Sequence, residues 1–201
     1  MATSPDYQAA HRYVMARLEN DLDAALTYHS VAHTRDDVLP AAEQLAQRSG
    51  VSGEDLLLLR TAALFHDVGF TKQRLGHEEA GIAIGEAVLP EFGYGPEQIE
   101  RISGMIRATR LPQRPQTLLE ELLADADLSV LGGTNFEERN RQLRDEMAVF
   151  GTQMTDEEWY TSQLDFVGSH RYFTAAARAL LEPRKQANLA FLREQLAHST
   201  G

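Results

Sequence analysis

The sequence predicts an all-α fold, and three observations lead to that prediction. Signals for the start of a helix recur along the 201 residues, apolar residues repeat with a helical period, and convincing strand signals are missing. Glycines and prolines separate the helical stretches, but no linker is long enough to divide the chain. We therefore expect one helical domain over residues 1–201.

The first half of the chain should contain four helices. Pro5 suits a first helical turn, Ser52 resembles an N-cap ahead of an acidic first turn, and Pro90 stops a helix. The expected elements are helices at about 4–27, 30–49, 52–67 and 77–89, with a polar loop at 71–76.

The second half should continue with helices of similar length. Two prolines bar a helix across residues 111–115, and capping-box patterns begin at Thr134 and Thr155. Glu182-Pro183 predicts the start of the last helix, and Trp159 and Tyr172 are expected to make core or interface contacts. The expected elements are helices at about 95–109 and 116–131, two helices opened by the capping boxes, and a last helix at 182–197.

Composition and charge argue against several classes of protein. Apolar residues make up 43% of the chain, and no run approaches the roughly 18 apolar residues of a membrane span. The net charge of -11 argues against binding a nucleic-acid polymer, although a metal and a few arginines could still attract a small phosphorylated substrate. The first residues lack the features of a secretion signal, so we expect a cytoplasmic protein. There is no cysteine, so any metal must be bound by His, Asp and Glu.

An adjacent His-Asp pair is the first candidate for chemistry. On a helix, His66 shares its face with Leu59 and Ala62 and should point inward, and Asp67 follows in the last turn. Gly69 is expected to act as a left-handed cap. A buried carboxylate beside a buried imidazole is costly unless it is compensated, and a bound cation is the usual compensation.

Two other helices carry residues that could complete such a site. His33 lies near the start of the second helix, and Asp127 shares its helical face with several leucines, whereas Asp125 points to the opposite side. One of these two aspartates should be buried or paired, and we favour Asp127. Two imidazoles and two carboxylates suit Mn, Fe, Co, Ni or Zn. His29 and His33 are four residues apart, but the glutamate of a zinc-protease motif is replaced by Ser30, so His29 is expected to support the ligands or to pack.

The order and spacing of these motifs resemble the HD-domain superfamily of metal-dependent phosphohydrolases. The run Leu123-Ala124-Asp125-Ala126-Asp127-Leu128 is similar to a bacterial subgroup of predicted HD phosphohydrolases. The motif-bearing resemblance covers about residues 28–132, and weaker similarity extends over a C-terminal helical part at about 134–198. It implies a five-helix core with extra terminal helices. It also implies one divalent metal, with Mg²⁺ as a further option, bound by His33, His66, Asp67 and Asp127.

The sequence argues against a second metal. His77 could match the first extra ligand of dinuclear relatives, but Arg110 stands in a region where related sequences often have histidine. A di-iron oxygenase is therefore disfavoured.

The resemblance implies hydrolysis of a small phosphoester, such as a nucleotide, by a metal-activated water. The catalytic candidates are Asp67, His77 and Lys72, and the acid or base is left open among His77, Glu78 and Asp125. The candidates for binding phosphate are Lys72, Arg74, Arg107 and Arg110, each of which could equally be a solvated surface residue. His29 and Asp125 are expected to support the metal ligands. The alternative is a regulatory module that binds the metal without turnover, and a homodimer remains one option for the assembly.

Overall fold

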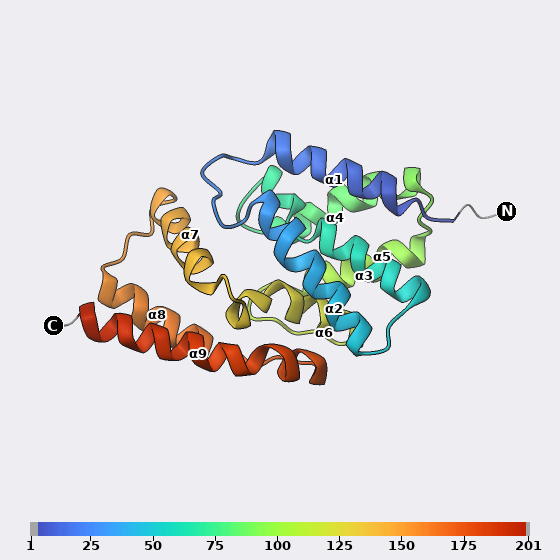
Figure 1. The fold of residues 1–201 in the computed structure, drawn as a ribbon. Coiled ribbons are helices and arrows are strands. Elements are labelled where there is room, and N and C mark those ends of the chain that lie inside the picture. The colour runs from blue at the N-terminus through green and yellow to red at the C-terminus, as the bar shows by residue number, and fades with distance from the viewer. Residues whose placement is uncertain (1–3, 200–201) are drawn as a thin grey trace.

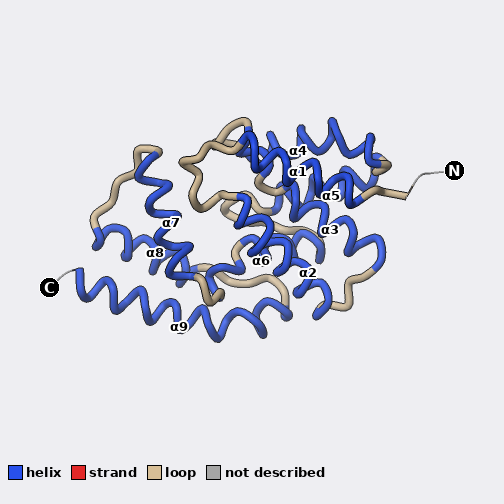
Figure 2. The backbone as a smooth tube through the Cα atoms, turned by 45° about the horizontal axis from the view of Figure 1, so that its top comes forward, coloured by secondary structure: helices blue, strands red, loops and turns tan. Residues whose placement is uncertain are grey.

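The computed structural model describes residues 4–199, and these residues form helices and loops without a strand (Figures 1 and 2). The all-α prediction is confirmed. The nine α-helices of this part are α1 (Tyr7–Asp21), α2 (Leu39–Arg48), α3 (Gly53–Phe65), α4 (His77–Val88), α5 (Pro96–Ala108), α6 (Leu118–Asp127), α7 (Phe136–Val149), α8 (Asp156–Ser169) and α9 (Ala175–Ser199). A π-helical segment, η1 (His33–Val38), precedes α2, and short 3-10 segments are η2 (Val68–Thr71), η3 (Leu89–Phe92) and η4 (Ser129–Gly132).

Helix α3 is the centre of the larger hydrophobic cluster. It packs against α1, α2, α5 and α6, and its residues Leu58, Leu59, Leu64 and Phe65 have no exposed surface. A helix that is apolar on most of its circumference is stable only when neighbours surround it. The buried environment at the end of α3 is therefore where His66 and Asp67 must lie.

A smaller hydrophobic cluster lies to one side of the first, among η4, α7, α8 and α9 (Figure 1). Trp159, Val167 and Leu192 are buried in this part, so of the core and interface contacts expected for Trp159 the structure shows the core position. Helix α9 joins the two clusters, because Ala177 packs in the larger one and Leu189 in the smaller one.

The last helix begins earlier than its sequence indicated. It starts at Ala175 and continues through Pro183, so the prediction of a start at Glu182-Pro183 was wrong. The Thr174 hydroxyl accepts a hydrogen bond from the Ala177 amide and acts as the cap. Packing of α9 on η4 and on α8 offsets the hydrogen bond that the proline cannot make.

Other boundaries differ from the expected ones by a turn or more. The first helix ends at Asp21 rather than near Thr27, and helical structure resumes only at about His33. The Thr155 capping box is present, whereas the box expected at Thr134 is absent because α7 begins at Phe136. The side chain of Asn135 donates to Asp37 instead of capping the helix.

Gly69 is required for close packing and not for a left-handed cap. Its φ is not positive, so the prediction of a left-handed cap was wrong. A Cβ at this position would lie 1.8 Å from the His77 carbonyl oxygen and 2.6 Å from the Gly81 amide nitrogen. The glycine therefore lets η2 approach the start of α4.

Candidate metal centre and adjoining cavity

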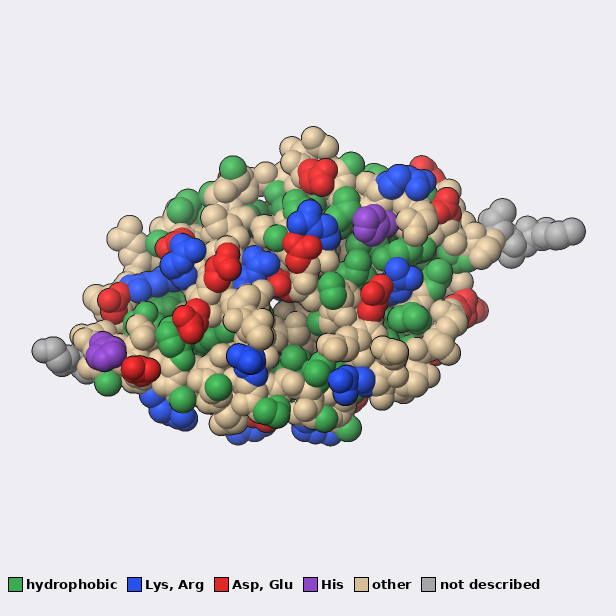
Figure 3. All heavy atoms as spheres, in the orientation of Figure 1, with side chains coloured by type: hydrophobic (Ala, Val, Ile, Leu, Met, Phe, Trp, Pro, Cys, Tyr) green, Lys and Arg blue, Asp and Glu red, His purple; other side chains and the backbone are tan. Residues whose placement is uncertain are grey.

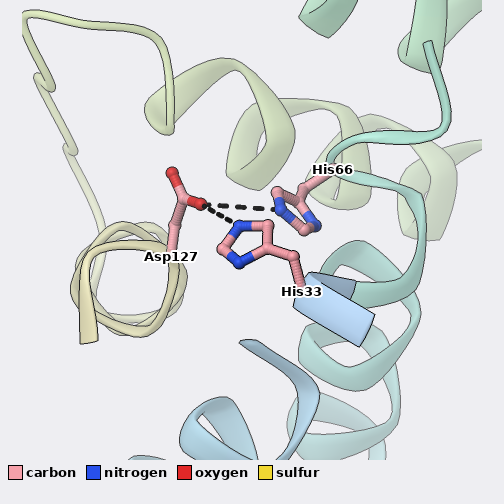
Figure 4. Close-up of side chains that lie close together, drawn as sticks. All are labelled: His33, His66 and Asp127. Carbon is pink, nitrogen blue, oxygen red and sulfur yellow. Dashed lines mark ion pairs between the residues drawn. The ribbon is translucent and has the colours of Figure 1, made fainter. Parts of the chain in front are cut away.

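Three helical segments bring His33, His66 and Asp127 together (Figure 4). His33 begins η1, His66 follows the last residue of α3, and Asp127 ends α6. Asp127 Oδ1 lies 3.4 Å from His33 Nε2 and 3.5 Å from His66 Nε2. These three residues form a potential metal site.

Asp67 lies against the same two imidazoles. Its Oδ2 is 3.2 Å from His66 Nε2 and 3.8 Å from His33 Nε2. The four residues that the resemblance implied as ligands are thus brought together around the two Nε2 atoms.

The orientation of His66 is set by the backbone of its own helix. Its Nδ1 lies 2.8 Å from the Ala63 carbonyl oxygen, which can only accept a hydrogen bond, so Nδ1 carries a proton. In the neutral ring the lone pair is therefore on Nε2, the atom that faces the two aspartates. A histidine held in this way by a carbonyl is the usual arrangement for a metal ligand.

Three polar atoms of the cluster are buried without a hydrogen bond to any described residue. Two of them, Nε2 of His66 and Oδ2 of Asp67, face the centre of the cluster; the third, Nδ1 of His33, lies on the side of Asp37. Such atoms carry a desolvation penalty unless another group satisfies them. A divalent cation between the imidazole nitrogens and the carboxylates would do so, and the nitrogen and oxygen donors suit a first-row transition metal.

The charges of the cluster also favour a bound cation. Burial opposes a charge on His33, but Asp127 and Asp37 outweigh it and raise its pKa to about 10. For His66 also, the nearby carboxylates outweigh burial and raise the pKa, and the two imidazoles hold the pKa of Asp67 below its usual range in spite of burial. A cation bound between the imidazoles and the carboxylates would balance the same negative charge, and its binding would compete with protons for the histidine nitrogens.

His33 is supported from behind by Asp37, which the sequence analysis did not single out. His33 Nδ1 lies 3.5 Å from Asp37 Oδ2. Asp37 is itself held by Arg139 of α7 at 2.8 Å and by Asn135 at 2.9 Å. The four-residue spacing of His33 and Asp37 was the one sequence signal for this pair, since Arg139 and Asn135 are about 100 residues away.

His29 does not contact the ligand atoms directly, and a buried glutamate holds it. Glu146 of α7 accepts hydrogen bonds from the backbone amides of Tyr28 and His29 at 2.8 and 3.0 Å and pairs with the His29 ring. Although burial opposes it, the contact with His29 lowers the pKa of Glu146. Glu146 thus fixes the turn that leads into His33, and no local pattern in the sequence pointed to this contact.

The roles expected for the two aspartates of α6 need correction. Asp125 is the fully buried one, and Asp127 keeps 18% of its side chain exposed at the site. Asp125 accepts hydrogen bonds from the amides of Phe173 and Thr174 and from the Thr174 hydroxyl, all at 2.7–2.8 Å. Asp125 therefore anchors the start of α9 and not the metal ligands.

His77 lies at the edge of the cluster. Its ring stacks on Phe70 at 4.0 Å between centroids, and its Nδ1 lies 3.1 Å from the Arg74 carbonyl oxygen. This contact leaves Nε2 facing Asp67 Oδ1 at 3.5 Å.

A cavity of about 390 Å³ opens beside these residues. Asp67, His77 and Asp127 lie on its wall, and the remaining wall is mainly apolar, with contributions from Leu128, Leu131, Phe136, Leu143 and Phe166. A concave, largely apolar space with a few polar groups is typical of a small-molecule site.

Two of the four expected phosphate-binding cations border this cavity, and two do not. Arg74 and Arg110 line it. Lys72 lines a neighbouring depression with Asp21 and Phe150, and Arg107 lies near Arg114 on another face and pairs with Glu79. Lys72 and Arg107 were expected near the metal because they are close to the motifs in sequence, but Lys72 at the end of η2 and Arg107 on α5 line other depressions.

On the face shown in Figure 3, acidic and basic side chains are interspersed. None of the helices among residues 4–199 is both long and apolar enough to cross a membrane.

Residues 32–129 match the family model of the HD domain. These residues therefore form an HD domain, and all four candidate metal ligands lie within them. A curated relative, the CC-adding tRNA nucleotidyltransferase of Thermus thermophilus, is 37% identical to this chain over 82 residues, and the match covers 34% of this chain. It spans only 19% of the length of that enzyme.

Solved structures share the whole fold. A predicted HD superfamily hydrolase from an uncultured Thermotogales bacterium is 24% identical, with a TM-score of 0.65 over 96% of this chain and 93% of its own. Bacillus subtilis YpgQ in complex with ADP is 18% identical, with a TM-score of 0.67 over 94% and 95% of the two chains. A protein from Lactobacillus plantarum is 18% identical, with a TM-score of 0.72 over 100% and 99%.

Proposed function

We propose that this protein is a metal-dependent phosphohydrolase that acts on a small phosphoester, with a nucleotide as the favoured class. One observation carries the proposal: the ligand atoms of His33, His66 and Asp127 lie within 4.8 Å of one another, and Asp127 borders a cavity of about 390 Å³. The likeness in fold to YpgQ, whose structure contains ADP, supports the choice of a nucleotide.

Four residues would bind the metal, and a fifth would transfer a proton. His33, His66, Asp67 and Asp127 would bind the metal, which supplies a Lewis acid and lowers the pKa of a bound water. His77 presents Nε2 toward Asp67 and the cavity, because the Arg74 carbonyl holds the other nitrogen. It is the group best placed to accept or to return a proton.

Charge on the phosphate would be met by Arg74 and Arg110, two of the three arginines that line the cavity. Arg110 pairs with Glu79 at 2.9 Å and lies 3.7 Å from Glu78, and the Arg74 guanidinium lies 3.7 Å from the centre of the Phe150 ring. These contacts hold both side chains beside the cavity, and a fixed cation stabilises charge on a phosphoryl group.

The first experiment measures metal and turnover together. Elemental analysis of the wild type should find about one divalent metal per chain, as expected for a single four-ligand site. A phosphoester panel assayed with Mn²⁺, Ni²⁺, Co²⁺ and Mg²⁺ should show hydrolysis. Asp127→Ala should lose both metal and hydrolysis, while Asp36→Ala, which changes an exposed carboxylate of η1, should keep both.

The possible results separate the candidate functions. Bound metal without hydrolysis of any phosphoester would favour the regulatory module. Metal absent from the wild type after it is purified and incubated with each ion would contradict the ligand set.

A further inference from the structure

The part of the cavity wall that α8 contributes contains a buried amide. Gln163 of α8 lines the cavity and keeps only 9% of its surface exposed. Around it the wall is apolar, with Leu131, Phe136 and Phe166 among the lining residues. None of the roles proposed above uses Gln163.

A chain of hydrogen bonds fixes the orientation of this amide. Trp159 Nε1 donates to Asn140 Oδ1 at 2.9 Å, and Asn140 Nδ2 donates to Gln163 Oε1 at 2.6 Å. The indole N–H can only donate, so Asn140 must present its oxygen to Trp159 and its nitrogen to Gln163. Gln163 must then present its oxygen to Asn140, and its Nε2 is left on the other side.

Nε2 of Gln163 makes no hydrogen bond with residues 4–199. Two N–H donors are therefore available in an apolar chamber, and their orientation cannot reverse without breaking the contact with Trp159. A ligand that covers these donors without offering an acceptor would leave them unsatisfied, so a ligand that brings an acceptor is preferred over one that brings another donor.

We propose that Gln163 determines specificity by donating from Nε2 to a carbonyl oxygen on the part of the substrate remote from the phosphate. This inference rests on the proposed function only for the position of the phosphate at the metal. It predicts that a ring carrying an oxo group is preferred over the same ring carrying an amino group. Trp159 and Asn140 are positioning residues, because they act through Gln163.

The single tryptophan of the chain provides a measurement that does not need turnover. Trp159 donates to Asn140, so a ligand that engages Gln163 should change its fluorescence. The probes are inosine and adenosine 5′-diphosphate, and uridine and cytidine 5′-diphosphate, since each pair exchanges a ring oxo group for a ring amine. Binding is measured with Mn²⁺ shortly after mixing, with excitation at wavelengths where the nucleotides do not absorb.

The wild type should bind the oxo member of each pair about tenfold more tightly, the effect of one hydrogen bond together with one avoided donor–donor contact. Gln163→Met removes the donors at similar size and should abolish the preference. Gln163→Glu keeps the oxygen for Asn140 and replaces the donors with an acceptor, so it should reverse the preference. Trp159→Phe, measured by calorimetry, should weaken the preference because Asn140 is no longer oriented.

Gln153→Glu is the matched control, since it adds the same charge at an exposed position and should leave the preference unchanged. Equal binding of both members, no binding of either, or a preference that persists in Gln163→Met would overturn the assignment. Hydrolysis of the phosphoester panel by the wild type is assayed separately. If no phosphoester is hydrolysed while the preference follows Gln163, the hydrolase proposal fails and the role of Gln163 stands.

Discussion

At the scale of single residues, the ligand histidines depend on partners that no phosphate or metal touches. Ala63 orients His66 through its carbonyl, and Asp37 pairs with His33 and is held in turn by Arg139. Such partners fix the tautomer and the direction of the ring, so their loss weakens a metal site whose ligands are intact.

Asp37→Asn tests this dependence. The variant keeps the size of the side chain but loses the charge that supports His33, so metal affinity should fall by about 10- to 100-fold. The measurement is a competition with a chelator of known affinity, and circular dichroism checks that the fold is retained. Asp36→Asn, at an exposed neighbouring position, is the control and should bind metal as the wild type does. Equal affinity in both variants would show that His33 does not need this carboxylate.

At the scale of elements, the position of His77 depends on how closely η2 approaches α4. Gly69 leaves no room for a Cβ, because the His77 carbonyl oxygen would lie 1.8 Å from it. The same contact that packs the two elements therefore sets the distance between His77 and Asp67.

Gly69→Ala should separate η2 from α4 and move His77. We expect a loss of about 1–3 kcal/mol in the free energy of unfolding, as for other overpacked sites, and a fall in any hydrolysis. Urea denaturation measures the first effect. Gly168→Ala in α8 is the control, since the nearest atom to its Cβ would be 3.9 Å away, and it should be neutral or stabilising. Equal midpoints for Gly69→Ala and the wild type would show that the elements can separate without cost.

The elements also show what the sequence could predict. Helix periodicity and capping signals gave the helical class and most helices, because these signals are local. Pro183 misled the prediction of α9, because tertiary packing holds a helix through it. The candidate ligands were recognised from their spacing along the chain. Arg139, Glu146 and Gln163 were missed because their partners are far away in sequence, and no local pattern encodes such a contact.

At the scale of the whole molecule, stability depends on the junction of its two hydrophobic clusters. His170 lies at this junction, between α8 and α9, with its ring 4.6 Å from Tyr172 and both ring nitrogens buried without a hydrogen-bond partner among the described residues. Burial, together with the nearby Lys185 ammonium, lowers its pKa to about 4.

This shift predicts a loss of stability in mild acid. Between about pH 6.5 and 4 the unfolded chain binds a proton at His170 and the folded chain does not, so stability falls as the pH is lowered through that window. His170→Asn removes the titrating group, and its urea midpoint should fall less than that of the wild type between pH 7 and pH 5. Parallel decreases in the two proteins would mean that His170 is not responsible. His198→Asn, at an exposed position, should behave as the wild type.

Two segments of the chain form the walls of the cavity, and they can evolve separately. The candidate ligands lie within residues 32–129, which the family model describes, whereas Asn140, Trp159 and Gln163 follow it. Selection can therefore alter the selectivity of this pocket by mutating the later stretch while the ligands are inherited unchanged. Similarity over the earlier stretch therefore identifies shared metal ligands, and paralogues that accept different compounds should also differ in the later stretch.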